Sequence, residues 1–351
     1  MNIKELLQQT IDSGASDLHI LTGVPPTLRI DGQLSPLSNF EVMTREAVSE
    51  LVSQSLTSEQ LSRVTVDKEI DFSLPFSDKA RFRGNIYTQK GTLAASFRRI
   101  PLEIPAIDSL GLPKILHSFT GLRQGLVLVT GPTGHGKSTT LASILNEINA
   151  NRFCHIVTIE DPIEFVFRSQ KSIVSQREMH SDTHSWGVAL RSALREDPDV
   201  VLVGEMRDYE TIAAALTVAE TGHLVFATLH TNSAAQTVDR IVDVFPEEQQ
   251  GQVRLQLSNV IEAVFSQRLV SAVPKGRAPA YELMLGTNAI KTSIRDGKSH
   301  MIDSILETST EAGMITLEKS LSELVKDGKI TLESAQNWSL RPELLSRLVR
   351  G

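Results

Sequence analysis

Four short, mainly apolar stretches dominate the chain after residue 121. They cover residues 126–129, 156–159, 200–203 and 224–227, and Thr158 is their one polar residue. Near-continuous apolar runs of this length are typical of parallel strands that are buried on both faces of a sheet. Between some of these runs lie stretches with helical spacing, at 138–148 and at 208–219. We expect a helix at each, and the second should end at Gly222. Strands that alternate with helices predict a doubly wound α/β domain.

The first 100 residues follow a different, mixed α/β pattern. We expect a short amphipathic helix over residues 1–13 and another over 44–56, with Thr44 as its N-cap. Turns are predicted at Asp31-Gly32 and at Lys90-Gly91, the second of them in a hairpin. Strand-like alternation of apolar and polar residues occurs at 16–20, 27–30, 80–87 and 93–100.

The segment 101–120 contains three prolines and one glycine, so we interpret it as a connector between two domains. The predicted organisation is therefore an N-terminal domain over 1–100, an α/β core over 121–288 and a mainly helical region over 289–351. In the helical region, apolar residues recur with helical spacing at 301–306 and at 317–325.

Composition limits the function classes. The 351 residues are 40% hydrophobic, which is enough for a substantial core, and they carry a formal charge of −7. No overall basic excess draws the molecule to nucleic acid or to anionic lipid. The single cysteine, Cys154, excludes an intramolecular disulfide framework and a cysteine-rich zinc site. No signal peptide and no apolar stretch of membrane-spanning length is recognisable, so we expect a cytoplasmic protein.

The strongest chemical motif is GPTGHGKS at residues 131–138, which fits the P-loop pattern and stands between an apolar strand and a helix. Its glycines allow a tight turn whose N–H groups point at phosphate oxygens, and the helix N-terminus adds partial positive charge. Lys137 is expected to bind the β- and γ-phosphates, and the Ser138 hydroxyl is expected to bind Mg²⁺. The predicted nucleotide-binding residues are Thr133, Gly134, His135, Gly136, Lys137, Ser138 and Thr139.

Acidic residues follow two of the other apolar runs. Glu205 ends the run at 200–203, as the carboxylate of a Walker B element does, where it can act on the water shell of the metal and polarise the attacking water. Ser138 and Glu205 are thus the predicted metal-site residues. The segment 158–164 (TIEDPIE) holds three carboxylates in five residues, and Glu164 is the best candidate for a second acidic site. A solvated acidic loop is the alternative for this segment.

Histidines and arginines complete the set of candidates. His223 and His230 bracket the fourth apolar run, where a histidine can contact a γ-phosphate or merely be a satisfied polar residue. Arg81 and Arg83 lie two apart in one predicted strand, and Arg98 and Arg99 follow in the partner strand. These arginines fit a solvated face, a nucleic-acid patch or fingers that reach a phosphate.

The motifs together resemble the secretion ATPases, and within them the retraction motors of type IV pili (PilT type). Four segments carry the resemblance: GPTGHGKSTT is similar to the Walker A element, TIEDPIE to the Asp box, DPDVVLVGEMRD to Walker B, and TGHLVFATLHTNSA to the His box. SDLHI and PPTLRIDGQL resemble the N-terminal domain of the family. The resemblance implies a RecA-like P-loop ATPase domain preceded by a smaller PAS-like α+β domain.

The resemblance also implies roles for individual residues. Glu205 is the catalytic carboxylate and Glu164 the Asp-box acid, while His230 and His223 belong to the nucleotide site. Arg83 and Arg98 match the N-domain arginines that approach the nucleotide phosphates in this family. The implied cofactors are ATP and Mg²⁺. The implied assembly is a homohexamer that works with an inner-membrane platform protein of the pilus, without membrane insertion and without nucleic acid.

The assignment to retraction motors depends on two further observations. Extension and type II secretion relatives usually carry a four-cysteine zinc element, which this chain lacks. Residues 289–301 (AIKTSIRDGKSHM) resemble a segment that the family associates with retraction, although they depart from its pattern at Lys291, Thr292, Ser293 and Asp296. His135 replaces a small residue that is common inside the P-loop.

Several alternatives stay open at this point. Within the same class, the chain could be an accessory retraction motor or another secretion-type ATPase. A RecA-like nucleic-acid translocase is a weaker alternative, because the chain is acidic and only 5% aromatic. A nucleotide-binding regulator without turnover is the last, and Glu205 and Glu164 argue against it.

Overall fold

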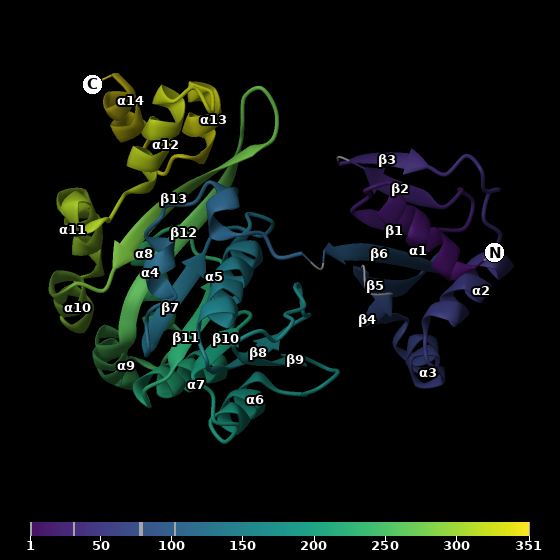
Figure 1. Ribbon diagram of the computed structural model, residues 1–351, viewed down its shortest axis with the longest axis horizontal. Coiled ribbons are helices and arrows are strands. Elements are labelled where there is room, and N and C mark those ends of the chain that lie inside the picture. Colours follow the sequence, from purple (N-terminus) through teal and green to yellow (C-terminus); the bar gives the residue numbers. More distant parts are fainter. Residues whose placement is uncertain (1, 31, 77–79, 102, 351) are drawn as a thin grey trace. The chain divides into compact units, whose positions relative to one another are not determined.

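The computed structural model describes residues 2–30, 32–76, 80–101 and 103–350 (Figure 1). Met1, Asp31 and Leu102, which fall within the predicted first helix, first turn and connector, lie outside this part, as do residues 77–79 and 351. Contacts between residues divide the chain into two units, Met1–Glu103 and Ile104–Gly351.

The boundary between the units falls inside the segment 101–120, but most of this segment belongs to the second unit. Ile107, Leu116 and Phe119 are buried in that unit's core, where they pack with residues of the helix that follows the P-loop. A connector is therefore the wrong description for residues 104–120. The prolines and the glycine made the segment resemble a linker, whereas the apolar residues between them fix it to the core.

The first unit is an antiparallel sheet with helices on one face. Its strands are ordered β3-β2-β1-β6-β5-β4, and the predicted hairpin around Lys90-Gly91 joins β5 to β6. Apolar residues of the helices, such as Leu6 and Leu51, share a core with Phe82 and Phe97 of the sheet. The elements are α1 (Ile3–Asp12), β1 (Asp17–Ile20), β2 (Thr27–Ile30), β3 (Gln33–Pro36), α2 (Arg45–Ser55), α3 (Ser58–Asp67), β4 (Glu69–Phe76), β5 (Ala80–Gln89) and β6 (Thr92–Pro101).

The second unit is built on a larger sheet with the order β13-β12-β7-β11-β10-β8-β9. Neighbouring strands are parallel except β12 and β13, which form an antiparallel hairpin. The four predicted apolar runs are all central strands of this sheet. The strands are β7 (Gly125–Thr130), β8 (His155–Glu160), β9 (Ile173–Glu178), β10 (Val200–Val203), β11 (Leu224–Leu229), β12 (Ile261–Ser271) and β13 (Arg277–Leu285).

Helices cover both faces of this sheet, so alternate residues of its strands enter two separate cores. Val127 and Val129 of β7 pack with residues of α5, whereas Leu126 and Leu128 pack with residues of α7 and α9. This arrangement confirms the predicted α/β fold class. The helices are α4 (Leu116–Phe119), α5 (Lys137–Asn151), α6 (Trp186–Ala193), α7 (Tyr209–Glu220), α8 (Ala234–Asp243), α9 (Glu247–Val260), α10 (Asn288–Arg295) and α11 (Ile302–Thr308).

Three more helices, α12 (Leu317–Lys326), α13 (Leu332–Trp338) and α14 (Pro342–Arg350), gather at one end of the β12–β13 hairpin (Figure 1). Their buried residues, among them Leu317, Leu321 and Leu345, form a small core with Val270 and Ala280 of the hairpin. Among the described residues, no helix is both long enough and apolar enough to cross a bilayer.

Candidate nucleotide-binding site

The P-loop, residues 131–138, joins β7 to α5 and contains glycines in conformations that other residues rarely adopt. The φ angles are +136° at Gly131, +80° at Gly134 and +85° at Gly136. A Cβ atom on Gly131 would lie 2.2 Å from the backbone O of Gln267, and one on Gly136 would lie 2.8 Å from Gln267 Nε2. The loop therefore closes tightly against β12, and a backbone of this shape is what binds phosphate in P-loops.

Lys137 lies at the start of α5 and is only 8% exposed. Its Nζ donates hydrogen bonds to the carbonyl oxygens of Gly131, at 2.8 Å, and of Pro132, at 3.0 Å. Burial lowers the pKa of Lys137, and the nearby carboxylates of Glu205 and Glu164 oppose this shift. The amino group is thus held by the loop that carries it, and both predicted acids act on it.

Glu205 follows β10, and its carboxylate is held by the side chains of Arg207 and His230. Its Oε2 lies 2.8 Å from Arg207 Nε, and its Oε1 lies 3.1 Å from His230 Nε2. His230 follows β11, and its Nδ1 lies 3.4 Å both from Lys137 Nζ and from the Thr133 hydroxyl. Because an ionised carboxylate can only accept, His230 Nε2 donates to Glu205 and leaves Nδ1 as an acceptor for the P-loop. One histidine therefore bridges the Walker A lysine and the Walker B glutamate.

The Asp-box segment 158–164 approaches the same edge of the sheet from β8. Glu164 is exposed, and its backbone N–H donates to Glu160 Oε2 at 3.4 Å. Glu160 is buried and accepts hydrogen bonds from the Thr158 hydroxyl, at 2.7 Å, and from Gln176 Nε2, at 3.2 Å. Burial raises the pKa of Glu160 to about 7. Glu160 thus supports the turn of the loop, while Glu164 is the acid that faces solvent.

Oxygen ligands at this edge suit Mg²⁺ better than an ion that needs a full protein cage. Ser138 and Thr139 lie in the first turn of α5, and the Glu205 side chain is 20% exposed. Within the described ranges, no group of three or more His, Cys, Asp or Glu could hold a metal ion by itself. Mg²⁺ is commonly bound through one or two protein oxygens, with water and substrate phosphates completing its coordination, and this donor set fits that pattern.

His223 does not join these residues. It precedes β11, whereas His230 follows it, and the six residues of this strand separate the two by about 20 Å at the usual rise of a strand. His223 Nδ1 lies 3.1 Å from the Val218 carbonyl and from the Thr221 hydroxyl, at the end of α7. The two histidines thus bracket β11 as predicted, and within this chain only His230 lies beside the P-loop.

Arg83 and Arg98 lie in the first unit and are directly paired across β5 and β6. Directly opposite residues on neighbouring strands project from the same face of a sheet. Arg98 Nε lies 2.9 Å from Asp17 Oδ1, and Arg83 Nη2 lies 3.8 Å from Asp71 Oδ1. Burial alone would raise the pKa of Asp17, but hydrogen bonds from Arg98 and Ser16 outweigh it and lower the pKa. The two arginines thus lie next to each other on the face without helices, each beside an aspartate.

Sequence reasoning missed three side chains that hold this site, namely Arg207, Gln267 and Arg268. Arg207 lies within the segment that resembles Walker B, but the resemblance gave it no role. Gln267 and Arg268 lie in β12, a strand that was not predicted, and each is 3% exposed. The available signal was the polar triplet Ser266-Gln267-Arg268 inside an otherwise apolar stretch, because polar residues in a buried strand need specific partners.

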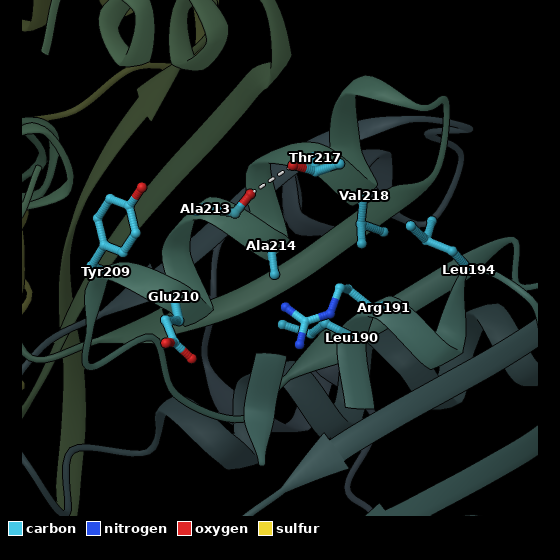
Figure 2. A pocket seen from close by; sticks show the side chains of 9 residues that line it. All are labelled: Leu190, Arg191, Leu194, Tyr209, Glu210, Ala213, Ala214, Thr217 and Val218. Atoms are coloured by element: carbon cyan, nitrogen blue, oxygen red, sulfur yellow. Dashed lines mark hydrogen bonds between the residues drawn. The ribbon is translucent and has the colours of Figure 1, made fainter. Parts of the chain in front are cut away.

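A groove between α6 and α7, of about 330 Å³, lies apart from the residues described above (Figure 2). Apolar side chains such as Leu190, Leu194 and Val218 line it, and Arg191 and Glu210 lie along it. It contains none of the predicted nucleotide-site residues, so it does not serve as the nucleotide pocket.

Known proteins resemble this chain over nearly its whole length. The family described as type II/IV secretion system protein matches residues 1–339. The chain belongs to this family. The type IV pilus retraction ATPase PilT of Pseudomonas aeruginosa is 47% identical over 98% of this chain and 99% of PilT. A twitching motility protein of Neisseria gonorrhoeae is 46% identical over 92% of this chain and 86% of its own length.

A crystal structure of the pilus retraction motor PilT with bound ADP has the same fold. It matches with a TM-score of 0.94 at 45% identity, covering 99% of each chain. As a secretion-system ATPase, this family member binds nucleotide and hydrolyses ATP, which sets aside the alternative of a regulator without turnover. Membership of the family also favours a secretion-type motor over a nucleic-acid translocase.

Proposed function

We propose that this chain is a motor ATPase that couples ATP hydrolysis to retraction of a type IV pilus. The observation that carries this conclusion is the 47% identity to PilT over 98% of this chain and 99% of PilT. The polar contacts from Lys137 through His230 to Glu205 supply a matching chemical site. The proposal thus rests on near-complete coverage together with a site of the right chemistry.

Residues 133–139 bind the phosphates of ATP in this proposal. The loop offers backbone N–H groups, and Lys137 exchanges its two bonds to the Gly131 and Pro132 carbonyls for contacts with the β- and γ-phosphates. Ser138 and Glu205 would hold Mg²⁺, which neutralises charge on the phosphates when it is bound. The exchange is favourable because the carbonyl oxygens are neutral acceptors, whereas the phosphate oxygens are charged and form stronger hydrogen bonds with the ammonium group.

Glu205 is the group that orients and polarises the attacking water. His230 contacts both Glu205 and Lys137 and so connects the carboxylate to the P-loop. Hydrolysis needs the carboxylate to leave at least one of its present partners, His230 or Arg207, and to face the water instead. Glu164 contributes a second negative charge from the Asp box. General bases of this kind contribute about 10²- to 10⁴-fold to turnover.

Arg83 and Arg98 give the first unit its part in the proposed cycle. A guanidinium near the γ-phosphate offsets the charge that develops on the transferring group. Because these arginines belong to one unit and the P-loop to the other, such a contact makes the arrangement of the units depend on the bound nucleotide. This dependence is the step that turns hydrolysis into movement.

The proposed assembly is a homohexamer in the cytoplasm, attached to the inner membrane through a platform protein of the pilus machine. The formal charge of −7 fits a protein partner better than nucleic acid. The alternative within the same class is an accessory retraction motor. The two roles can be distinguished by expressing the chain in two pilated strains, one lacking the primary motor and one lacking the accessory motor. The strain that regains twitching shows which motor the chain replaces.

Replacing Glu205 by glutamine tests the chemical part of the proposal. The variant keeps the side-chain shape but loses the charge, so phosphate release should fall at least 100-fold while binding of a fluorescent ADP analogue stays within threefold of wild type. Glu248→Gln, on the exposed first turn of α9, is the matched control and should release phosphate at the wild-type rate. Wild-type turnover in Glu205→Gln would show that another group activates the water.

A further inference from the structure

Strand β12 carries three consecutive polar side chains in the interior of the second unit. Ser266, Gln267 and Arg268 are 1%, 3% and 3% exposed. A buried polar or charged side chain lowers stability unless it is hydrogen-bonded, so each of these residues needs a partner. The Ser266 hydroxyl bonds that of Thr130 on the neighbouring strand, at 2.6 Å, but Gln267 and Arg268 are bonded to loops of the nucleotide site.

Gln267 uses both ends of its amide on the P-loop and the helix that follows it. Its Oε1 accepts a hydrogen bond from the Thr140 hydroxyl at 2.6 Å, and its Nε2 donates to the His135 carbonyl at 3.0 Å. The backbone N–H of Leu269 also donates to His135 Nδ1, at 2.9 Å. The middle of the P-loop is therefore held from one side by a single strand.

Arg268 holds the loop that follows His230. Its Nη2 donates to the backbone O of Asn232 at 3.0 Å. On the paired strand β13, Glu282 Oε1 accepts a hydrogen bond from the backbone N–H of Ala234 at 2.7 Å. These two contacts fix the residues on either side of Ser233, whose own side chain caps α8. The segment that positions His230 is thus tied to the β12–β13 hairpin.

We propose that Gln267 and Arg268 are positioning residues that set the P-loop and the His230 loop at a fixed distance from each other. Successive side chains of a strand point to opposite faces, so two neighbouring residues of one strand can hold two loops that lie on different sides. The inference rests on the proposed function, because it assigns Lys137 to phosphate binding and His230 to the alignment of Glu205.

The two residues are expected to affect different kinetic constants. Gln267 shapes the phosphate cradle, which ATP and ADP share, so its loss weakens binding of both nucleotides and leaves turnover at saturation largely unchanged. Arg268 shapes the position of His230 relative to Glu205, so its loss lowers kcat and leaves nucleotide affinity largely unchanged. A residue with a merely structural role would change both constants or neither.

The test uses the full-length chain, steady-state phosphate release and a fluorescent ADP analogue. Gln267→Met, which leaves the Thr140 hydroxyl and the His135 carbonyl without their partner, should raise the Kd for the analogue about tenfold and change kcat less than threefold. Arg268→Met should lower kcat at least tenfold and change the Kd less than threefold. Gln252→Met and Arg240→Met, on exposed positions of α9 and α8, are the matched controls.

Two additional variants cover misfolding of Arg268→Met. In Arg268→Met/Glu282→Gln, the acid near Arg268 is replaced together with the guanidinium, so neither position keeps an ionisable group without its partner, and the loss of kcat should persist. Arg268→Lys keeps a donor for Asn232 and should return kcat to within threefold of wild type. Loss of the split between Kd and kcat, in a wild type that hydrolyses ATP, would overturn this inference alone. A wild type without ATPase activity would overturn it together with the proposed function.

Discussion

Replacing Glu282 by glutamine should change how the stability of the second unit depends on pH. Glu282 is 2% exposed on β13. Burial raises the pKa of its carboxyl to about 7; the Ala234 N–H and Arg341 oppose the shift, and the carboxylates of Asp303 and Glu318 add to it. Burial lowers the pKa of Arg268, and the nearby Glu282 carboxylate opposes that lowering. The group is thus a buried acid whose proton is bound more tightly in the folded chain.

The size of the effect follows from the shift. A carboxyl whose pKa is raised on folding contributes its full stability below the unfolded-state value, 4.5, and loses it as the pH rises to the folded value of about 7. Each unit of this difference corresponds to about 1.4 kcal/mol, so the total loss is about 3 kcal/mol. About 2 kcal/mol of this loss falls between pH 5.5 and pH 8.5. Glutamine keeps the acceptor for Ala234 but has no such proton to lose.

Urea unfolding followed by tryptophan fluorescence measures this difference, because Trp186 and Trp338 both lie in the second unit. Between pH 5.5 and 8.5, the free energy of unfolding should fall by about 2 kcal/mol less in Glu282→Gln than in wild type. Glu248→Gln should follow the wild-type profile. Parallel profiles for wild type and Glu282→Gln would refute the reasoning, as would a variant that is less stable than wild type at pH 8.5. Either result would mean that the carboxylate stays ionised beside Arg268.

Three further changes test the proposed cycle. Lys137→Ala removes the phosphate contact and should weaken ATP binding at least tenfold in a fluorescent-nucleotide titration, and unchanged affinity would contradict the P-loop role. Arg98→Ala should slow phosphate release at least tenfold with little change in nucleotide affinity. Arg98→Lys, which keeps a cation for Asp17, controls for stability. Normal turnover in Arg98→Ala would mean that the arginine is only a solvated surface residue. Arg295→Ala/Lys298→Ala on the exposed surface at and just after the end of α10 should leave ATPase activity within twofold but abolish twitching in cells, whereas equal loss of both would place this segment in the catalytic fold.

The α10 test uses Arg295 and Lys298 because the neighbouring Ile294 is 1% exposed and packs in the main core. The expectation of a mainly helical region over 289–351 could not show that Ile294 points inward. Truncating a buried isoleucine costs about 2–5 kcal/mol, which would confuse loss of retraction with loss of folding. The exposed ion pairs of Arg295 and Lys298 with Asp296 contribute at most about 1 kcal/mol each.

The central strands and the P-loop could be predicted from sequence because their signals are local. Short apolar runs such as 200–203, bounded by turn or polar residues, are typical of buried parallel strands, and a P-loop is defined by eight consecutive residues. The role of Gln267 could not be predicted in this way, because its partners Thr140 and His135 lie more than 120 residues earlier in the chain. Only the order of the strands brings them together.

Residue types alone could not place two parts of the chain. His223 precedes its strand, and in a parallel sheet that position lies at the end opposite the P-loop of the same chain, so strand polarity alone separates it from His230. The segment 104–120 was interpreted from its prolines, whereas Ile107 and Phe119 decide its place in the core. In both cases a side chain's neighbours in space, and not its residue type, determined the outcome.

Direct pairing of Arg83 with Arg98 places two positive charges opposite each other on neighbouring strands. Like charges directly opposite each other on neighbouring strands destabilise a sheet. Asp17 and Asp71 offset part of this repulsion from the outer sides. An anion that binds both guanidinium groups is attracted to each of them and also reduces the repulsion between them. Under the role proposed for these arginines, binding of a nucleotide phosphate would therefore stabilise the first unit itself.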